Sequence, residues 1–274
     1  MTLSISLFIT NAIADTDTDT DTDTVNESDA IPAHENITFT GHAYDQETGV
    51  LLYTEHHSHI SKFEHLVEYK EVNGDVFATK KIQYQSSYLS PDFKQENWRN
   101  GEQISTQRNI ENSEDKGSKD SILVTYKEDA DSDLKNEIIN HRDNLIIDAG
   151  FNNFISQNWD ELINGKVMTV EYLIPSLLDT YELNIKKTTC EDSRHYCFSI
   201  SSSSFFIGLI SSNLKLTYGS IHSHENNQNN KEYRLISFEG RSNICDQEGD
   251  YQDVEIKYSY PQKMLNQINP SIKI

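Results

Sequence analysis

The chain has 274 residues, a length that fits one large domain or two modest ones, and it carries 44 Asp and Glu residues against 23 Lys and Arg. Its formal net charge of −21 repels phosphate backbones, so the composition argues against nucleic-acid binding. No apolar run beyond the N-terminus approaches the roughly 18 residues that cross a bilayer, so no transmembrane segment is expected.

The first 36 residues predict an export signal and a leader. Residues 1–14, MTLSISLFITNAIA, form an uncharged apolar run that ends in small residues, as a cleaved signal peptide does, although the usual positive residues at its start are missing. Residues 15–36 begin with an Asp-Thr repeat and contain too few apolar side chains to offset their ordering entropy, which predicts a disordered leader. We therefore expect an exported, periplasmic protein cleaved near Ala14, with a disordered cytosolic N-terminus as the alternative.

Residues 37–262 carry a strand pattern and are expected to form a single β-rich domain, with residues 263–274 as a C-terminal tail. Runs rich in Val, Ile, Thr and Tyr, separated by turn sequences, predict eleven strands. The runs cover residues 37–45, 50–60, 65–72, 76–85, 122–129, 167–174, 180–187, 195–202, 214–221, 233–242 and 253–260. Asn73 and Gly74 indicate a hairpin with a type I′ turn. Together these features predict a mainly β fold, with a single meandering antiparallel sheet curled into a barrel or half-barrel.

One segment, about residues 148–164, follows a helical period instead. Its apolar residues recur at three- and four-residue steps, Asp148 can cap its start, and Gly165 stands just past its end. The apolar positions are Phe151, Phe154, Ile155, Trp159, Leu162 and Ile163. The pattern predicts one amphipathic helix packed on the sheet, either as plain core packing or as a lid over a ligand cavity.

A second apolar patch, FFIGLI at residues 205–210, is bracketed by serines. It is interpreted either as a buried turn or as a loop at the mouth of a cavity, able to contact acyl chains. The candidates for lining such a cavity are Phe151, Phe154, Trp159, Phe205 and Phe206.

Cys190 and Cys197 bracket six residues between two predicted strands, so they can close a short disulfide loop of the kind found in exported proteins. Cys245 is left over, either buried or paired with a partner. A zinc site at Cys190, Cys197 and His195 is disfavoured, because the pattern lacks a tight C-x-x-C pair and an evident fourth ligand.

Histidines are concentrated in residues 51–66, where four of the ten occur: His56, His57, His59 and His65. If this stretch is a strand, Glu55, His57 and His59 share one face and His56 lies on the other. His57 and His59 then form an H-x-H pair that can supply two metal ligands, and His222 with His224 forms a second pair. A metal site requires the two strand ends to converge. Otherwise these are ordinary histidines on a solvated sheet face.

Several longer motifs follow one another between Thr40 and Tyr260. They are GHAYDQETGVLLYTEHH, VEYKEVNGDVFATKKIQY followed by SPDF, IDAGFNNFISQNWDELINGK with IPSLLDTYELNIKK, and LKLTYG ahead of LISFEGRSNI. In the order of these motifs the chain resembles a family of uncharacterised exported proteins of gammaproteobacteria. The resemblance implies an exported single-domain protein, and it carries over no activity or functional residue. The Asp-Thr leader and the Asn-rich turn HENNQNNK depart from the family, which implies that neither is central to a shared function.

The chain lacks a G-x-S-x-G elbow, a Gly-rich phosphate loop, an H-E-x-x-H pair and a dinucleotide fingerprint. We expect a non-catalytic periplasmic binding or carrier protein for a lipid or other apolar ligand, without a cofactor. One alternative is a metal-binding protein or metalloenzyme that uses His57, His59, His222 and His224. The other is an envelope structural or interaction protein with a protein partner.

Overall fold

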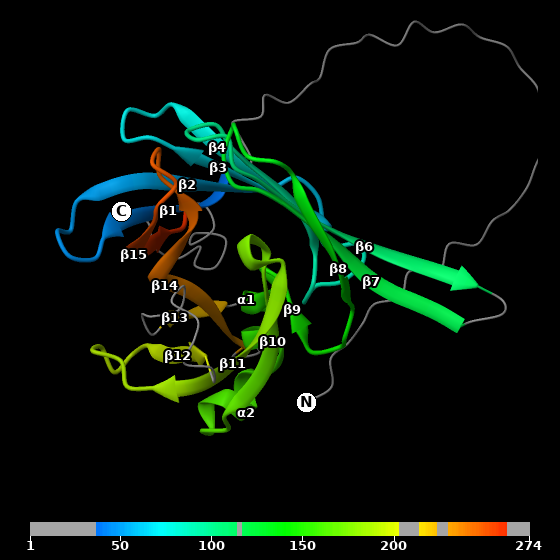
Figure 1. Cartoon of the computed structure of the whole chain (residues 1–274). Helices are drawn as coiled ribbons and strands as arrows, with labels where there is room; N and C mark the ends of the chain where they lie inside the picture. The colour runs from blue at the N-terminus through cyan, green and yellow to red at the C-terminus, as the bar shows by residue number, and fades with distance from the viewer. Residues whose placement is uncertain (1–36, 114–116, 203–213, 224–229, 262–274) are drawn as a thin grey trace, which may run out of the picture. The chain divides into compact units, whose positions relative to one another are not determined.

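The structure, a computed structural model, describes residues 37–113, 117–202, 214–223 and 230–261 (Figure 1). The predicted signal peptide, leader and C-terminal tail lie outside these residues, as do Phe205, Phe206 and His224. In this part of the chain no helix is long and apolar enough to span a membrane.

The described strands join into one 15-stranded sheet. The first eight are β1 (Ile37–Asp45), β2 (Leu51–His59), β3 (Glu64–Lys70), β4 (Val76–Gln83), β5 (Asp92–Asn97), β6 (Gln103–Ser113), β7 (Gly117–Lys127) and β8 (Lys135–Asn140). The others are β9 (Leu145–Ile146), β10 (Met168–Ile174), β11 (Asp179–Thr188), β12 (Tyr196–Ser202), β13 (Leu214–Ser223), β14 (Asn230–Cys245) and β15 (Tyr251–Ser259). Two helices, α1 (Gly150–Gln157) and α2 (Trp159–Ile163), and a 3-10 turn, η1 (Pro175–Leu177), complete the described elements. The predicted mainly β fold with one large sheet is confirmed.

The strand order follows the chain outward in both directions from the β1–β15 pair. On one side the sheet runs from β1 through β2 to β8, and on the other from β15 through β14 to β9. All neighbours are antiparallel except β9 and β10, which are parallel. The two edge strands, β8 and β9, are separated by residues 141–144 alone and do not pair. The sheet is therefore an open, curled half-barrel with two edges that are consecutive in the sequence.

All eleven predicted strands are present, and four further strands, β5, β6, β8 and β9, were not predicted. On β5 the inward positions include Gln95 and Asn97, and on β6 they include Thr106, all of which are buried. These polar side chains remove the alternation of apolar and polar residues by which a half-buried strand is recognised. Strand β8 is almost entirely exposed, and β9 has only two residues.

The hairpin at Asn73 and Gly74 is present, but its predicted type I′ turn is wrong. Gly74 N–H donates to Glu71 O at 2.9 Å, and Gly74 has a φ of +96° while Asn73 keeps a negative φ. This is the longer hairpin loop in which a left-handed glycine forms a bulge. The Asn73 side chain accepts a hydrogen bond from Asp75 N–H at 3.0 Å, which stabilises this alternative turn.

The predicted single helix over 148–164 is two short helices that meet at Asn158. The backbone and side-chain nitrogens of Asn158 both donate to Phe154 O, at 3.1 and 2.9 Å, and this competing hydrogen bond accompanies the break. Asp148 does not cap the helix, contrary to prediction. It adopts a φ of 44° and pairs with Lys80 instead. Gly165, with a φ of +92°, ends the segment as predicted.

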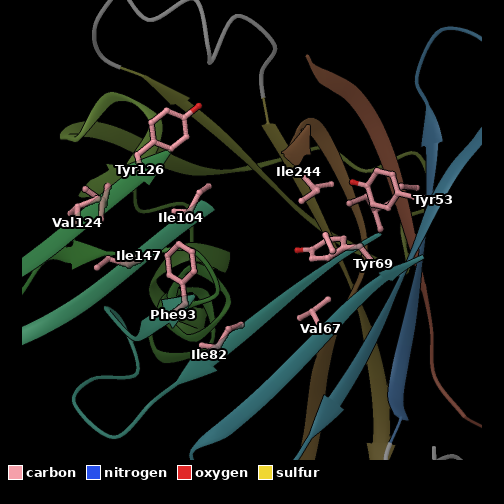
Figure 2. Close-up of a cluster of buried hydrophobic side chains, with 14 of the residues drawn as sticks. Tyr53, Val67, Tyr69, Ile82, Phe93, Ile104, Val124, Tyr126, Ile147 and Ile244 are labelled. Carbon is pink, nitrogen blue, oxygen red and sulfur yellow. The ribbon is translucent and has the colours of Figure 1, made fainter. Parts of the chain in front are cut away.

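Two packed cores fill the interior. The first lies between β1–β7, β14 and β15, and Figure 2 shows members of it, among them Tyr53, Phe93 and Ile244, directed into one interior. The second joins α1 and α2 to β10–β13. The segment 145–147 alternates between them, since Leu145 and Ile147 belong to the first core and Ile146 to the second. The helical segment therefore closes the space inside the half-barrel with side chains.

The predicted disulfide between Cys190 and Cys197 is present in the structure, with 5.4 Å between the two Cα atoms. It closes the loop that connects β11 to β12. Such a bond restricts the unfolded chain and persists in oxidising compartments.

Candidate functional site

An aromatic layer lies between the helical segment and the strands β12–β14. Trp159 stacks on Tyr233 with 4.0 Å between ring centroids. It meets Tyr196, Phe198 and Tyr218 edge-on, at 5.3 to 5.5 Å. Stacked and edge-on rings bury a large apolar area in a defined geometry. Trp159 therefore ties the helical segment to three strands of the sheet.

The predicted cavity-lining residues of the described chain lie in this second core. Phe154 and Trp159 are buried, and the half-buried Phe151 meets Tyr172 edge-on at 5.9 Å. Their rings contact other side chains. A hollow of about 160 Å³ is lined by residues 156–161, so Trp159 is the one predicted cavity residue among the described ones that lines it.

The indole nitrogen of Trp159 is the unusual feature of this layer. Trp159 is 9% exposed, and its buried Nε1–H makes no hydrogen bond of good geometry, although the Tyr233 hydroxyl lies beside it as an acceptor. A buried donor without any acceptor costs about 1–3 kcal/mol, and a poorly formed hydrogen bond leaves part of that cost in place. A hollow lined by the same residue lies beside it, and the nitrogen itself is covered.

The surroundings of the hollow are acidic. Asp160 and Glu161 both line it, and Glu161 forms an ion pair with Lys166. The chain as a whole carries a net charge of −21. An anionic group approaching the hollow is therefore repelled, whereas a neutral acceptor such as a hydroxyl or carbonyl group is not.

A second polar cluster joins strands β2, β3 and β15 around the histidine-rich stretch. Glu55, only 3% exposed, lies 3.2 Å from Nε2 of His57 and accepts a hydrogen bond from the Tyr258 hydroxyl at 3.4 Å. Nδ1 of His57 lies 3.2 Å from Nε2 of His65. The ring of His59, which is exposed, lies 4.5 Å from the ring of His65. Polar contacts thus run from the buried Glu55 carboxylate through His57 to His65, and the ring of His65 meets that of the exposed His59.

Burial sets the protonation of this cluster. It lowers the pKa of His65 to about 3, and the positive charges of His57, His59 and Lys80 act in the same direction. Burial also lowers the pKa of His59, with a smaller contribution from His57. His65 is therefore a neutral imidazole at pH 7, with one donor and one acceptor nitrogen.

The predicted alternation of side chains on β2 is confirmed. Glu55, His57 and His59 share a face, whereas His56 hydrogen-bonds to Thr54. Sequence reasoning missed His65 as a member of the cluster. The hairpin between β2 and β3 could have revealed it, because that pairing sets His65 opposite His59. Tyr258 lies on β15, and no local sequence pattern predicts that β15 pairs with β1.

The structure does not bring the two H-x-H pairs together. His222 lies on β13, four strands from β2 in the sheet, and His224 lies outside the described residues. The two nitrogens of His57 face different neighbours, Glu55 and His65. Across the described ranges, no group of three or more His, Cys, Asp or Glu side chains is placed to share a metal ion.

Cys245 is a buried free thiol at the end of β14. Its sulfur accepts hydrogen bonds from the side chains of Asn97 at 3.3 Å and Asn100 at 3.2 Å. Burial, assisted by the negative charge of Glu102, raises the pKa of this thiol to about 12. The thiolate is the reactive form of cysteine, so Cys245 is an inert core residue.

We expect native protein at pH 8 to react with DTNB at least about a thousandfold more slowly than a free thiol, because raising the pKa from ~8.5 to about 12 removes nearly all thiolate. In urea without reductant, one thiol per chain should react, since the other two cysteines are bonded to each other. Absorbance of the released thionitrobenzoate measures both rates. Fast reaction of the native protein would show that Cys245 is accessible.

No protein-family model matches the chain, and neither a curated protein nor a solved structure was found to be similar to it. The resemblance to exported gammaproteobacterial proteins therefore stays a prediction.

Proposed function

We propose that this protein is a non-catalytic carrier for an apolar ligand with a neutral polar head group, which it binds beside Trp159. The observation that carries the proposal is the buried indole N–H, whose contact with the Tyr233 hydroxyl is not a hydrogen bond of good geometry, next to a hollow lined by the same residue. Because this nitrogen is covered, a head-group oxygen would reach it only after the Trp159 side chain shifts, and it would then form the better hydrogen bond. The apolar part of the ligand would contact the surrounding aromatic layer.

Binding requires the helical segment to move, because its side chains fill the space that an acyl chain needs. The break at Asn158 lies directly before Trp159 and is the natural hinge for α2. Beyond that break, α2 and its C-terminal turn are held to the sheet by the aromatic layer and by a hydrogen bond from Lys187 Nζ to Ile163 O at 3.0 Å. A ligand can replace the ring contacts with contacts of its own.

Export supports a carrier that works outside the cytoplasm. The pair Cys190 and Cys197 forms a disulfide, a bond that reducing compartments do not maintain. The apolar N-terminal sequence up to Ala14 is typical of a signal peptide. We place the protein in the periplasm on these grounds.

The expected result of a binding test is a saturable change in Trp159 fluorescence. The chain has two tryptophans, and Trp98 is 59% exposed, so Trp98→Phe leaves Trp159 as the single reporter. Monodecanoylglycerol, titrated below its aggregation concentration, should bind with one-to-one stoichiometry. Decanoate has the same chain length and an anionic head group, and it should bind at least about tenfold more weakly because the hollow is acidic.

The matched control is Trp159→Phe, which keeps Trp98 as the reporter and removes the indole N–H. Its fluorescence should not change on titration, and native mass spectrometry should show less bound monoglyceride. A Trp98→Phe protein that shows neither a spectral change nor a mass shift with either compound would contradict the carrier function.

A further inference from the structure

Strand β8 is an edge of the sheet. It pairs with β7, and none of the other described strands pairs with its other side (Figure 1). Its side chains are almost all exposed, and Leu134, just before it, and Ile138 are large apolar residues that are 57% and 58% exposed. An exposed edge strand with apolar side chains is a template on which another strand can pair.

Two hydrogen bonds establish which backbone groups of β8 face outward. His141 N–H, just past the strand, donates to Asp120 O of β7 at 3.1 Å. Because antiparallel strands bond through alternate residues, Asn136, Ile138 and Asn140 direct their backbone groups away from β7. Ile138 N–H accordingly donates to the side chain of its own neighbour, Glu137, at 3.2 Å.

We propose that β8 pairs antiparallel with β8 of a second copy of this chain, about a twofold axis at Asn136. This register places Lys135 opposite Glu137 of the second copy, and Glu137 opposite its Lys135. It also places Leu134 opposite Ile138, twice, on the other face. Opposite charges and apolar side chains that face each other across a strand pair both stabilise the pairing.

Neighbouring registers lack this complementarity. An axis at Glu137 places that carboxylate opposite itself, and an axis at Ile138 places Lys135 opposite His141. The axis at Asn136 also pairs residues whose backbone groups face outward. Asn136 can therefore exchange backbone hydrogen bonds with Asn136 of the second copy, and Leu134 with its Ile138. The sequence of the edge is therefore self-complementary in the register that its backbone permits.

Net charge opposes this association, since each copy carries −21. At physiological ionic strength, charges more than about 8 Å apart are largely screened, so the local ion pairs outweigh distant repulsion there. The dimer is independent of ligand carriage, because β8 and Trp159 are on separate parts of the fold.

Sedimentation velocity over a range of concentrations in 0.15 M salt tests the pairing. Wild-type protein should show a concentration-dependent dimer. Lys135→Glu turns both ion pairs into pairs of like charge and should raise the dimer dissociation constant at least about tenfold. The double variant Lys135→Glu/Glu137→Lys exchanges the two charges and should restore the wild-type value. Both residues are exposed, so the variants should keep the wild-type unfolding midpoint.

Recovery in the double variant is the decisive result, because a general effect of charge would not be reversed by the exchange. Wild-type protein that remains monomeric at every concentration would overturn self-pairing and leave the edge to a strand of another protein. A dimer that Lys135→Glu does not weaken would overturn it as well, since the copies would then associate through a different surface.

Discussion

Replacing Asp148 with asparagine is expected to lower the free energy of unfolding by about 2–4 kcal/mol. Nζ of Lys80 lies 2.5 Å from Oδ2 of Asp148, and the Lys80 side chain is only 2% exposed. Removing the carboxylate leaves a buried ammonium without its counter-charge, which is the costly way to break a buried ion pair. Asparagine tolerates the left-handed φ of 44° at this position, so the substitution changes charge without adding backbone strain.

The double variant Lys80→Met/Asp148→Asn is the matched control. Methionine fills a volume similar to that of the lysine chain and needs no counter-charge, so the double variant should recover most of the stability lost in Asp148→Asn. Urea unfolding at pH 7, followed by circular dichroism, measures all three proteins. If the single and double variants lose the same stability, the ion pair is not what holds the helical segment against β4.

The position of Asp148 shows where sequence reasoning succeeds and where it fails. A carboxylate before an amphipathic segment is a good candidate for a helix cap, and the sequence contains nothing that points to Lys80, 68 residues away. The structure pairs them because the segment 145–150 lies inside the half-barrel, where Lys80 of β4 projects. Local patterns predict elements, whereas contacts between distant strands decide what a polar residue does.

The same distinction applies to the strands. Strands with an apolar inner face were predicted, because their apolar and polar residues alternate according to which side chains are buried. Strand β5 was missed because Gln95 and Asn97 occupy inner positions, where they donate to backbone carbonyls of Asn243 and Cys245 on β14. Polar inner positions are stable when a distant element accepts their hydrogen bonds, and no local pattern reveals that element.

The candidate sites divide in a similar way. Trp159 was predicted from helical spacing, which gives the direction of its side chain. The poor geometry of its hydrogen bond to Tyr233 becomes visible only when all neighbours are placed. The histidine cluster was half predicted, because alternation on one strand gives Glu55, His57 and His59 a shared face. His65 requires the hairpin register, and Tyr258 requires the order of the sheet.

The stability of the protein is expected to fall on acidification by about 3 kcal/mol between pH 7 and pH 4 through His65 alone. Its pKa is about 3 in the folded state, against ~6.5 in the unfolded chain. The unfolded state therefore binds a proton as the pH falls below about 6.5, while folded His65 stays neutral, and the difference favours unfolding until the pH nears 3. Above pH 7 both states are neutral at this residue and the contribution is complete.

His65→Phe keeps a ring of similar size and removes the titration, so it isolates this contribution. The free energy of unfolding, measured in urea at intervals from pH 7 to pH 4, should decline less steeply in the variant than in the wild type. His56→Gln serves as the control. Burial lowers the pKa of His56 too, but this residue is only half-buried on the opposite face, so its effect should be smaller.

Parallel curves for the wild type and His65→Phe would mean that His65 takes up its proton in the folded state as readily as in the unfolded one. The charged imidazole would then be stabilised in the folded state by water or by the Glu55 carboxylate, against the burial and the two other histidines that lower its pKa. If the free energy of unfolding declines more steeply in the wild type, the His65 ring stays neutral in the folded state as the solution is acidified. The pH dependence therefore tests, at a single residue, whether β2, β3 and β15 close over the cluster as the structure describes.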